Sequence, residues 1–323
     1  MIKKINIKTD ETGDRLDSYL AKQFSNLSRS YLAKQIKEGG VTVNSKLVKS
    51  SYKLNPLDQI ELNFTIQQEE KRILPEKIDL DIIYEDENVI VLNKKPGIVV
   101  HPAAGNTKGT LVNALLQYFP KIKEAVYQKG NVVSEQRPGL VHRLDKDTSG
   151  VMIVAKNSRA MHSLSRQIQN RTIKKIYWAL CCGWPKNSKG RLINYLGRHP
   201  KNRKMIADIG KDKGKEAISD YEVLQYLEDK AGNRVSLIEF DIKTGRTHQI
   251  RVQANIIGTP VLGDSVYGDK HCINLSKKLN VERQMLHAKI LEITLPGDQK
   301  KSVFKAPLPE DFNSRLENLK VIQ

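Results

Sequence analysis

Apolar residues recur every three or four positions in two neighbouring stretches near the start of the chain, a spacing typical of amphipathic helices. The first stretch contains Leu16, Tyr19, Leu20 and Phe24. The second begins at Ser28, a good N-cap residue, and ends at the glycines at 39–40. Its Leu32 and Ile36 share one helical face. The opposite face carries Ser30, Lys34 and Lys37, so the second helix is predicted to pack on one side and to be basic on the other.

Alternation of apolar and polar residues replaces the helical spacing after the glycine pair, as in half-buried strands. It is seen at Val41 and Val43, and again at Ile60, Leu62 and Phe64. A polar, charged stretch interrupted by Pro75 follows at 67–79. We therefore predict a small α/β unit at 1–70, a linker at 71–80 and a second domain at 81–323.

The second domain is dominated by apolar stretches of strand length. They lie at 89–92, 98–100, 140–142, 151–155, 176–180, 236–241 and 290–295. Helix-spaced apolar residues occur between them, at 111–118, 161–168 and 248–257. Because the strands and helices do not alternate regularly, the pattern predicts an α+β domain with a mixed, mainly antiparallel sheet.

Net charge adds a partner to this picture. The 323 residues include 54 Lys and Arg against 36 Asp and Glu, a formal charge of +18, whereas the apolar share of 39% is ordinary for a folded soluble protein. Lys and Arg neutralise phosphates and release condensed counterions, so nucleic acid is the leading partner. A chain that is basic only for solubility is the alternative.

The sequence shows no signature of a membrane span, a secretory signal or a common cofactor. It has no run of about 18 apolar residues, and its first ten residues alternate Ile with Lys and Asn. The dinucleotide and phosphate-loop glycine motifs are missing, and the spacing of Cys181, Cys182 and Cys272 suits neither zinc nor a disulfide framework. We expect a cytoplasmic protein with no membrane association, no cofactor and no metal.

One polar segment of the second domain is a candidate for chemistry. A strand-like stretch ends at His142, and polar or small residues turn the chain from Asp145 to Gly150. Side chains where a strand meets a loop are well placed for function on a rigid scaffold. Turn chemistry alone explains the residues at 147–150, but it does not explain Arg143 and its neighbours beside Asp145.

This segment, His142-Arg143-Leu144-Asp145 with Asp147-Thr148-Ser149-Gly150, resembles the catalytic motif of the RluA/RluD-type RNA pseudouridine synthases. Three further family motifs are matched in order at 175–183, 244–252 and 286–291, and 109–116 favours the RluD-like branch. The resemblance extends from about 81 to 308. One departure is Pro96, which stands one residue later than in the family's Asn-Lys-Pro-x-Gly segment. The resemblance as a whole implies the pseudouridine synthase fold.

The N-terminal unit is similar to the alpha-L RNA-binding domain named after small-subunit ribosomal protein S-four, which many RluD-like enzymes carry. The match lies in Arg15-Leu16-Asp17, in Ser28-Arg29-Ser30 and in the segment 39–44. The resemblance implies RNA contacts from basic residues on this S-four-type domain, which are Arg15, Arg29, Lys34 and Lys37. A solvated charged helix is the alternative explanation for such a stripe.

Conversion of uridine to pseudouridine breaks the C1′–N1 bond and forms C1′–C5 without net redox change, so it requires no cofactor. By resemblance, Asp145 attacks the sugar C1′ or the uracil C6, or assists glycal formation, and Arg246 faces and orients it. The resemblance also implies that Tyr177 stacks on the uracil and that Arg143 fills the gap left by a flipped nucleotide. His142 and Leu291 are expected in the substrate pocket.

We therefore interpret the chain as an RNA pseudouridine synthase and expect it to be a monomer. The RluD-like resemblance implies large-subunit ribosomal RNA as substrate. Transfer RNA stays open as a substrate. A non-catalytic RNA-binding or ribosome-assembly factor on the same fold is one alternative. A glycosidase or nuclease that uses Asp145 and Asp147 is another, although two acids one residue apart on a turn are not obviously opposed across a substrate.

Overall fold

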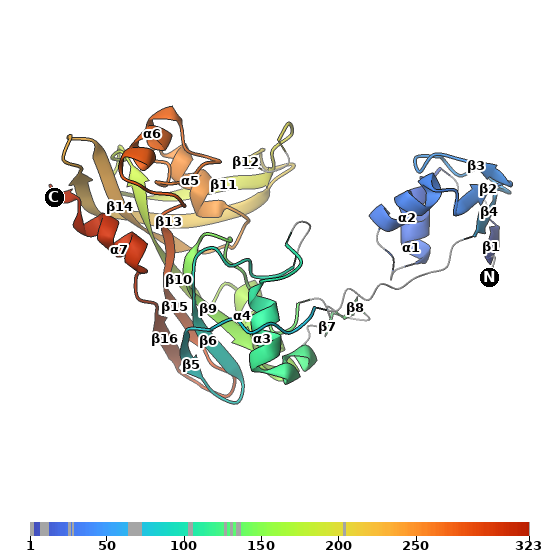
Figure 1. Cartoon of the computed structure of the whole chain (residues 1–323), viewed down its shortest axis with the longest axis horizontal. Coiled ribbons are helices and arrows are strands. Elements are labelled where there is room, and N and C mark those ends of the chain that lie inside the picture. The colour runs from blue at the N-terminus through green and yellow to red at the C-terminus, as the bar shows by residue number, and fades with distance from the viewer. Residues whose placement is uncertain are drawn as a thin grey trace. The chain divides into compact units, whose positions relative to one another are not determined.

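The chain forms two compact units in the computed structural model, Met1–Arg72 and Ile73–Gln323 (Figure 1). The structure describes residues 13–24, 27, 29–63, 73–102, 106–125, 137–202 and 205–322, together with the backbone of 3–6, 128–129 and 132–133. Ser28, Phe64 and part of the predicted linker lie outside the described residues. We describe each unit by itself.

The N-terminal unit packs two helices on a small sheet, as the sequence predicts. The helices are α1 (Leu16–Gln23) and α2 (Arg29–Lys37). The antiparallel sheet has the order β1 (Lys3–Asn6), β4 (Gln59–Leu62), β2 (Val41–Val43) and β3 (Lys46–Leu47). Its core is formed by the apolar faces identified above, with Leu16, Leu20 and Leu32 fully enclosed. Burial of these faces supplies the main stabilising term of the unit.

The second unit contains a long mixed sheet in which β15 and β9 pair in parallel and the other described pairings are antiparallel. Its order is β12 (Ile206–Asp208), β11 (Lys189–Arg198), β13 (Lys215–Glu228), β14 (Arg234–Ile242), β10 (Lys174–Cys182), β15 (Leu286–Thr294), β9 (Ser149–Ala155), β6 (Val89–Lys94) and β5 (Ile82–Glu85). Strand β16 (Lys301–Lys305) pairs with β15, and β17 (Lys320–Val321) pairs with β13. A separate pair joins β7 (Gln128–Lys129) and β8 (Val132–Val133).

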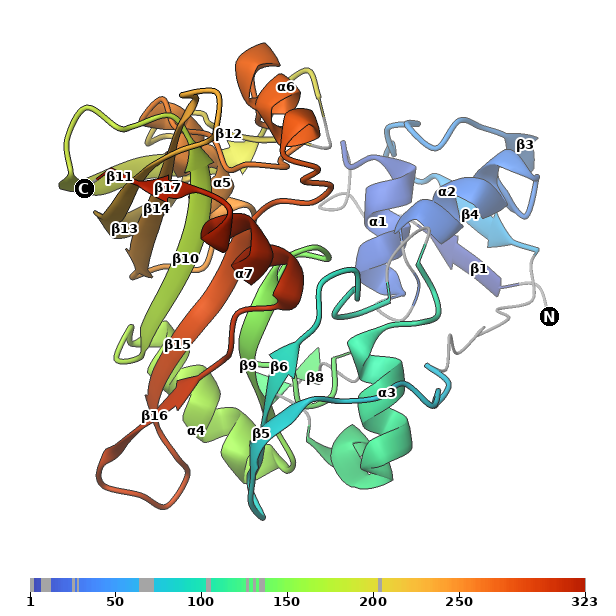
Figure 2. The same ribbon diagram turned by 60° about the vertical axis from the view of Figure 1, so that its left-hand side comes forward.

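The helices of this unit lie around the sheet and do not alternate regularly with its strands (Figures 1 and 2). They are α3 (Leu111–Tyr118), the 3-10 helix η2 (Pro120–Glu124), α4 (Ser158–Gln169), α5 (Gln249–Ile256), α6 (Lys270–Lys278) and α7 (Glu310–Glu317). The α+β prediction with a mainly antiparallel sheet is confirmed. The two longest strands that the sequence analysis did not identify, β11 and β13, carry an exposed or half-buried face with charged residues, which weakens their apolar pattern.

Two of the predicted strands are wrong. The segment 98–100 is no strand, because its carbonyls accept hydrogen bonds from the first turn of α3 (Leu111 N to Val99 O, 2.9 Å). In 140–142, Leu140 alone makes an isolated bridge to Val154. The chain leaves the sheet at this point, and the departure carries the following polar segment to the site described below.

The C-terminal half of the predicted linker is packed on the second unit. Asn113 Nδ2 donates to Leu74 O at 2.7 Å, and Glu76 N donates to Asn113 O at 3.0 Å. Asn113 also completes the capping box of α3 with Thr110. These contacts join residues 74–76 to the helix, which is why the second unit begins at Ile73.

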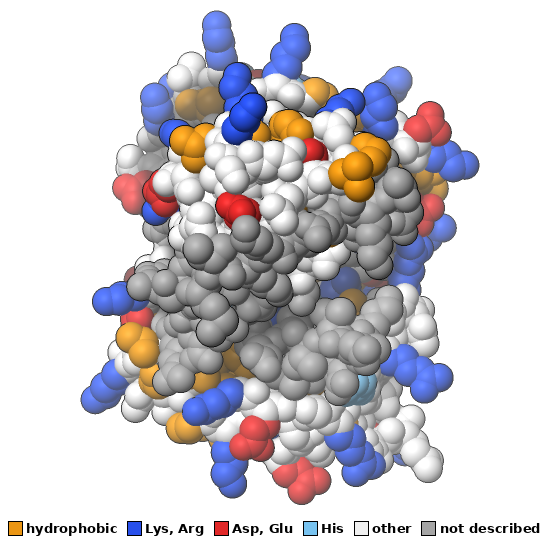
Figure 3. All heavy atoms as spheres, turned by 90° about the vertical axis from the view of Figure 1, so that its right-hand side faces the viewer, with side chains coloured by type: hydrophobic (Ala, Val, Ile, Leu, Met, Phe, Trp, Pro, Cys, Tyr) orange, Lys and Arg blue, Asp and Glu red, His pale blue; other side chains and the backbone are white. Residues whose placement is uncertain are grey.

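Positive side chains are spread over the face of the molecule shown in Figure 3. Such a surface agrees with the net charge of +18 and attracts polyanions at long range. Among the helices of the described residues, none is both long enough and apolar enough to cross a membrane.

Candidate active site

A cavity of about 610 Å³ opens beside β10 and α5 in the second unit. Asp145 is the acidic residue among its described lining residues. The cations that line it are Arg137, Arg143, Arg171, Lys175, Lys243, Arg246 and Arg251. Tyr177 and His142 also contribute to the wall. The cavity therefore surrounds one carboxylate with many positive groups, an arrangement that suits a polyanionic substrate with one reacting centre.

Asp145 is held by a partner from the first turn of α5. Arg251 Nη1 donates to Asp145 Oδ2 at 3.3 Å, and His248 Nε2 lies 3.9 Å from the same oxygen. The Asp145 side chain keeps 19% of its surface exposed, so it is open to the cavity. Burial lowers the pKa of His248 despite the charge of Asp145, so this imidazole is neutral near pH 7. A carboxylate fixed by a guanidinium and open on one side can act as a nucleophile or a base.

Arg251 is itself fixed by a second carboxylate. Its Nε and Nη2 donate to the two oxygens of Asp264 at 2.6 and 2.8 Å, and the Asp264 side chain is fully enclosed. Although burial opposes it, the hydrogen bonds and charges of Asp264 and Asp145 raise the pKa of Arg251. The Tyr267 ring centroid lies 5.1 Å from the guanidinium carbon of Arg251. The Tyr267 hydroxyl forms a hydrogen bond with His248 Nδ1 at 2.8 Å. The group that orients Asp145 is therefore rigid and always charged.

Tyr177 faces the same cavity from the middle of β10 and is 8% exposed. Burial, together with the charge of Asp145, raises the pKa of its phenol well above the usual range. The ring is therefore neutral at physiological pH and offers a flat apolar surface close to Asp145. A detached uracil could be held on such a surface.

The loop that carries Asp145 is anchored from both sides. The buried Lys94 Nζ donates to the carbonyls of Lys95, Ile98 and Lys146 at 2.8 to 2.9 Å, and burial lowers its pKa to about 7. Arg283 Nη1 donates to Asp147 O at 2.9 Å. Gly150 has φ +115°, and a Cβ there would lie 2.2 Å from Ala288 O, so glycine is required. The turn residues of the motif thus serve to fix the position of Asp145.

The structure corrects the expectation that Arg246 faces Asp145. Arg246 lines the cavity, but its Nε donates to Glu216 O at 2.9 Å, and Arg251 holds the place beside Asp145. The two arginines belong to the same sequence motif. Arg246 lies in the loop before α5, whereas Arg251 is the third residue of the helix and is buried. The start of the helix therefore decides which arginine meets the carboxylate.

Leu291 is also not where we expected it. It is 2% exposed and packs in the main core, pairing across the sheet with Phe304 of β16. The same strand, β15, contributes Leu286 to the cavity wall. We expected Leu291 in the substrate pocket because it is the last residue of the 286–291 motif. The residue of this motif that lines the cavity is the first one, Leu286.

His142 and Arg143 stand next to each other but face different surroundings. His142 Nε2 accepts from Ile153 N at 3.1 Å, and burial with the charge of Lys175 lowers the pKa of this imidazole to about 3. His142 is thus a neutral wall residue that ties the Asp145 segment to β9. Arg143 is exposed and lines the cavity. An exposed cation at that position is accessible to an RNA strand that enters the cavity.

The predicted RNA-binding cations of the N-terminal unit fall into two groups. Arg15 and Arg29 both donate to the buried carboxylate of Asp17, at 3.0 to 3.1 Å. Lys34 lies 3.7 Å from Glu38, and Lys37 is exposed at the end of α2. The arginines are therefore fixed in position, and the lysines extend from the surface.

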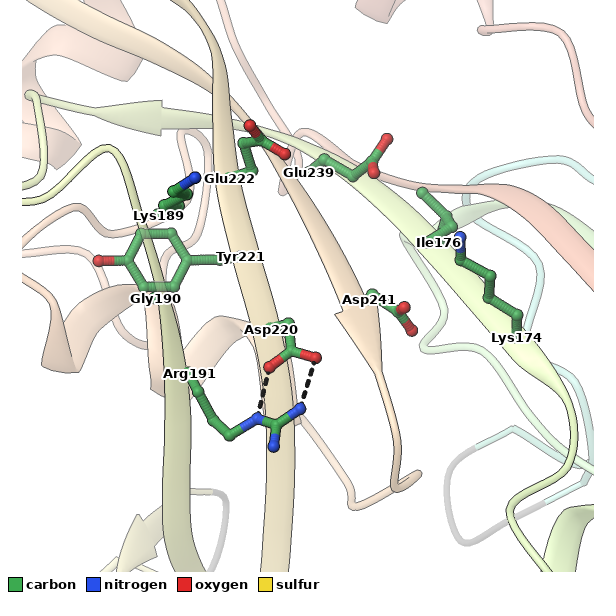
Figure 4. Close-up of a pocket in the computed structure, with 10 residues that line it drawn as sticks. All are labelled: Lys174, Ile176, Lys189, Gly190, Arg191, Asp220, Tyr221, Glu222, Glu239 and Asp241. Atoms are coloured by element: carbon green, nitrogen blue, oxygen red, sulfur yellow. Dashed lines mark hydrogen bonds and ion pairs between the residues drawn. The ribbon is translucent and has the colours of Figure 1, made fainter.

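A second hollow, of about 400 Å³, lies on the opposite face of the sheet (Figure 4). Alternate residues of β10 face it, Lys174 and Ile176, while Tyr177 faces the Asp145 cavity. Asp220 in this hollow is paired with Arg191 at 2.6 Å. Lys243 lies between Asp220 and Asp241. These ion pairs stabilise an exposed sheet face and provide no free reactive group like Asp145.

The structure also bears on the other readings of the sequence. Asp147 does not share the Asp145 cavity among its described lining residues, which disfavours a pair of carboxylates acting across one substrate. No group of three or more His, Cys, Asp or Glu in the described part of the chain is arranged to hold a metal ion.

Comparisons with known proteins define the class. The family model described as RNA pseudouridylate synthase matches residues 88–255, and a model described as S4 domain, the S-four-type fold expected above, matches residues 14–60. The chain belongs to the RNA pseudouridine synthase family and carries an N-terminal S-four-type RNA-binding domain. It is an isomerase of this class.

Individual relatives are similar over most of the chain. An uncharacterized RNA pseudouridine synthase of Chlorobaculum parvum is 39% identical over 98% of each chain. The ribosomal large subunit pseudouridine synthase D of Neisseria meningitidis serogroup A is 40% identical over 98% of this chain and 82% of its own. Among solved structures, human RNA pseudouridylate synthase domain containing 1 matches with a TM-score of 0.56 and 27% identity, over 73% of this chain and 87% of its own.

Sequence reasoning missed several residues of the site. Arg251 lies within the family motif at 244–252, but no local signal distinguishes it from Arg246. Asp264 and Tyr267 belong to no recognised motif and reach the site through the chain that follows α5. Lys94 had a signal, since a buried lysine that follows a run of four apolar strand residues is unusual and requires partners.

Proposed function

We propose that this enzyme converts uridine to pseudouridine in large-subunit ribosomal RNA, with Asp145 as the reacting group. The observation that carries the proposal is the Asp145 carboxylate fixed by Arg251 in a cavity whose other charged lining residues are cations. The relatives named ribosomal large subunit pseudouridine synthase D support the substrate. Cytoplasmic location and a monomeric state are part of the same proposal.

The residues divide the reaction between them. Asp145 acts at the sugar or at the uracil while the C1′–N1 bond breaks, and its charge stabilises the cationic sugar that develops. Tyr177 holds the detached uracil by its face while C5 turns toward C1′. After C1′–C5 forms, C5 loses its proton and N1, which was bonded to C1′ in uridine, takes up a proton, so the product is an isomer of the substrate. Arg143 takes the place of the extruded nucleotide in the RNA stack.

The test of the catalytic role is Asp145→Asn, because the amide keeps the shape of the side chain and loses its charge. RNA labelled with tritium at uracil C5 releases the label when C1′–C5 forms. We expect the Asn variant to lose activity on the order of 10⁴-fold while its RNA affinity stays within about twofold of the parent. Asp147→Asn is the matched control and should keep its activity. Turnover by Asp145→Asn at more than a few per cent of the parent rate would refute the role.

The test of the substrate is a map of pseudouridines in ribosomal RNA from cells that lack the gene. We expect at least one site in the large-subunit RNA to be lost, and to return with the wild-type gene but not with the Asp145→Asn gene. Loss of sites in transfer RNA alone would refute the ribosomal substrate and leave the activity in place.

A further inference from the structure

Lys175 and Arg246 are two of the cations in the wall of the Asp145 cavity that make no contact with Asp145. Lys175 and Tyr177 are two residues apart on β10, and both face the cavity because alternate strand residues share a side. Arg246 follows β14 and lines the same cavity. Lys175 Nζ lies 3.7 Å from the point where a Cβ of Gly245 would stand, so the ammonium is next to the segment that carries Arg246.

In the described residues neither side chain of this pair forms an ion pair with a carboxylate, and the charge of Asp241 acts on Lys175 only from a greater distance. In the part of the chain that the structure describes, Lys175 Nζ has no hydrogen-bond acceptor, although the side chain is half-buried. The hydrogen bond of Arg246 goes from Nε to a backbone carbonyl, that of Glu216, and no carboxylate in those residues pairs with its guanidinium. Polar groups that lose water on burial are normally paired, so this wall lacks an anion.

We propose that Lys175 and Arg246 together bind a backbone phosphate of the RNA next to the target uridine and so position that nucleotide at Asp145. The inference rests on the proposed function, which brings a uridine into this cavity. A phosphodiester supplies the negative charge and the oxygen acceptors that both side chains lack. The uracil itself is neutral and lies against Tyr177. The phosphates on either side of the target ribose are the anions closest to an inserted base, and the pair contacts one of them.

The decisive experiment removes the same charge from the protein and from the RNA. A short RNA containing the mapped uridine is made in three forms, with native phosphates or with a neutral methylphosphonate on the 5′ or on the 3′ side of that uridine. Wild-type protein, Lys175→Met and Arg246→Met are compared for tritium release and for direct RNA binding. Lys174→Met is the matched control, because Lys174 directly precedes Lys175 in β10 and faces the opposite side of the sheet.

On native RNA, Lys175→Met and Arg246→Met should lower kcat/KM by about 10- to 100-fold, mainly through KM, since a hydrogen bond to a charged group is lost. One of the two methylphosphonates should impose a loss of at least this size on the wild type and a smaller loss on either variant, because each variant keeps only one of the two contacts to that phosphate. Lys174→Met should behave as the wild type on all three RNAs. Equal penalties from both methylphosphonates in wild type and Lys175→Met would overturn the proposal, as would a Lys175→Met effect on kcat alone, which would indicate proton transfer to the uracil.

A pH profile gives a readout that a structural role would not produce. Burial lowers the pKa of Lys175 to about 8, with Asp241 opposing and Arg246 adding to the shift, and the neutral His142 is the other titratable group that faces it. The phosphate binds the ammonium form, so wild-type kcat/KM should fall as pH rises through about 8. Lys175→Arg stays charged, and the ratio of its kcat/KM to that of the wild type should rise about tenfold between pH 7 and 9. A constant ratio would count against the proposal.

Failure of the proposed function would look different. It would appear as wild-type protein that forms no pseudouridine in any native ribosomal RNA. Binding of the three RNAs to the same proteins would still show whether Lys175 meets a backbone phosphate.

Discussion

Two ion clusters, one in each unit, are built from the same groups in opposite proportions. In the N-terminal unit one carboxylate, Asp17, meets two guanidiniums, Arg15 and Arg29. In the second unit one guanidinium, Arg251, meets two carboxylates, Asp264 and Asp145. In both clusters the shared central group is nearly enclosed, with 6% of the Asp17 side chain and 7% of the Arg251 side chain exposed.

The outer groups differ, and they show what each cluster can do. The side chains of Arg15 and Arg29 are about half exposed, at 49% and 53%. In the second unit Asp264 is enclosed, and Asp145 alone reaches the cavity. The open groups are two cations in one unit and one anion in the other. A buried counter-charge thus fixes the direction of an open group while leaving it free to meet a ligand.

The largest effect is expected from Arg251→Met. The change leaves the enclosed Asp264 without its partner, so the free energy of unfolding should fall on the order of 3 to 5 kcal/mol. Asp145 loses its orienting group, and tritium release should fall by about 100-fold. Urea unfolding and single-turnover rates at a temperature where the variant is folded would measure both. A larger fall in the saturated rate for Arg246→Met than for Arg251→Met would show that the sequence-based assignment of Arg246 is correct.

A smaller effect is expected from Asp264→Asn. The amide still accepts from Val266 N and Tyr267 N through its oxygen, and Arg251 keeps its contact with Asp145. We expect a loss of about 2 kcal/mol in the free energy of unfolding and about tenfold in rate. The double variant with Arg251→Met should be more stable than Arg251→Met alone, because the unpaired buried charge is gone. Additive losses would mean that the two side chains are not coupled.

In the N-terminal unit, Asp17→Asn should cost only about 1 kcal/mol at pH 7, because the partner arginines are half exposed and screened by solvent. Burial raises the pKa of Asp17, but hydrogen bonds and charges from Arg15 and Arg29 outweigh it and lower the pKa. This stabilisation is therefore full above the unfolded value of about 4 and is lost as pH falls through the folded one. Amide hydrogen exchange of peptides from 13–63 in the full chain would measure it. The parent and the variant should differ at pH 7 and converge at acid pH.

The smallest effects are expected from the lysines of α2. Lys34→Ala and Lys37→Ala should each weaken RNA binding by a few-fold and reduce the dependence of log Kd on log salt by about one unit. Lys22→Ala is the control, because Lys22 is already paired with Asp14 at 2.7 Å. RNA titrations at several salt concentrations would measure the slopes. An unchanged slope for both variants would mean that α2 does not contact the phosphates.

The elements that follow from local pattern were determined by the sequence itself. Helix α3 has the predicted bounds of 111–118, because its apolar spacing coincides with a capping box at Thr110. Strands β6, β9 and β10 carry continuous apolar runs, and the two helices of the N-terminal unit show their buried faces directly. Hydrophobic period reports burial within one element, so these predictions needed no knowledge of the neighbours. The motif around Asp145 likewise pointed to the carboxylate that we propose as the reacting group.

The partners of the charged groups were decided only by the tertiary structure. Arg246 and Arg251 are five residues apart in one motif, and the start of α5 between them turns only Arg251 toward Asp145 and Asp264. The sequence predicted Arg15 and Arg29 only as RNA-binding cations. In the structure both donate hydrogen bonds to Asp17, because α1 and α2 pack together. A charged side chain shows no period that reveals its partner, because the pairing depends on distances between elements that are remote in sequence. Packing sets those distances, and with them which charges are neutralised inside the protein and which stay open to RNA.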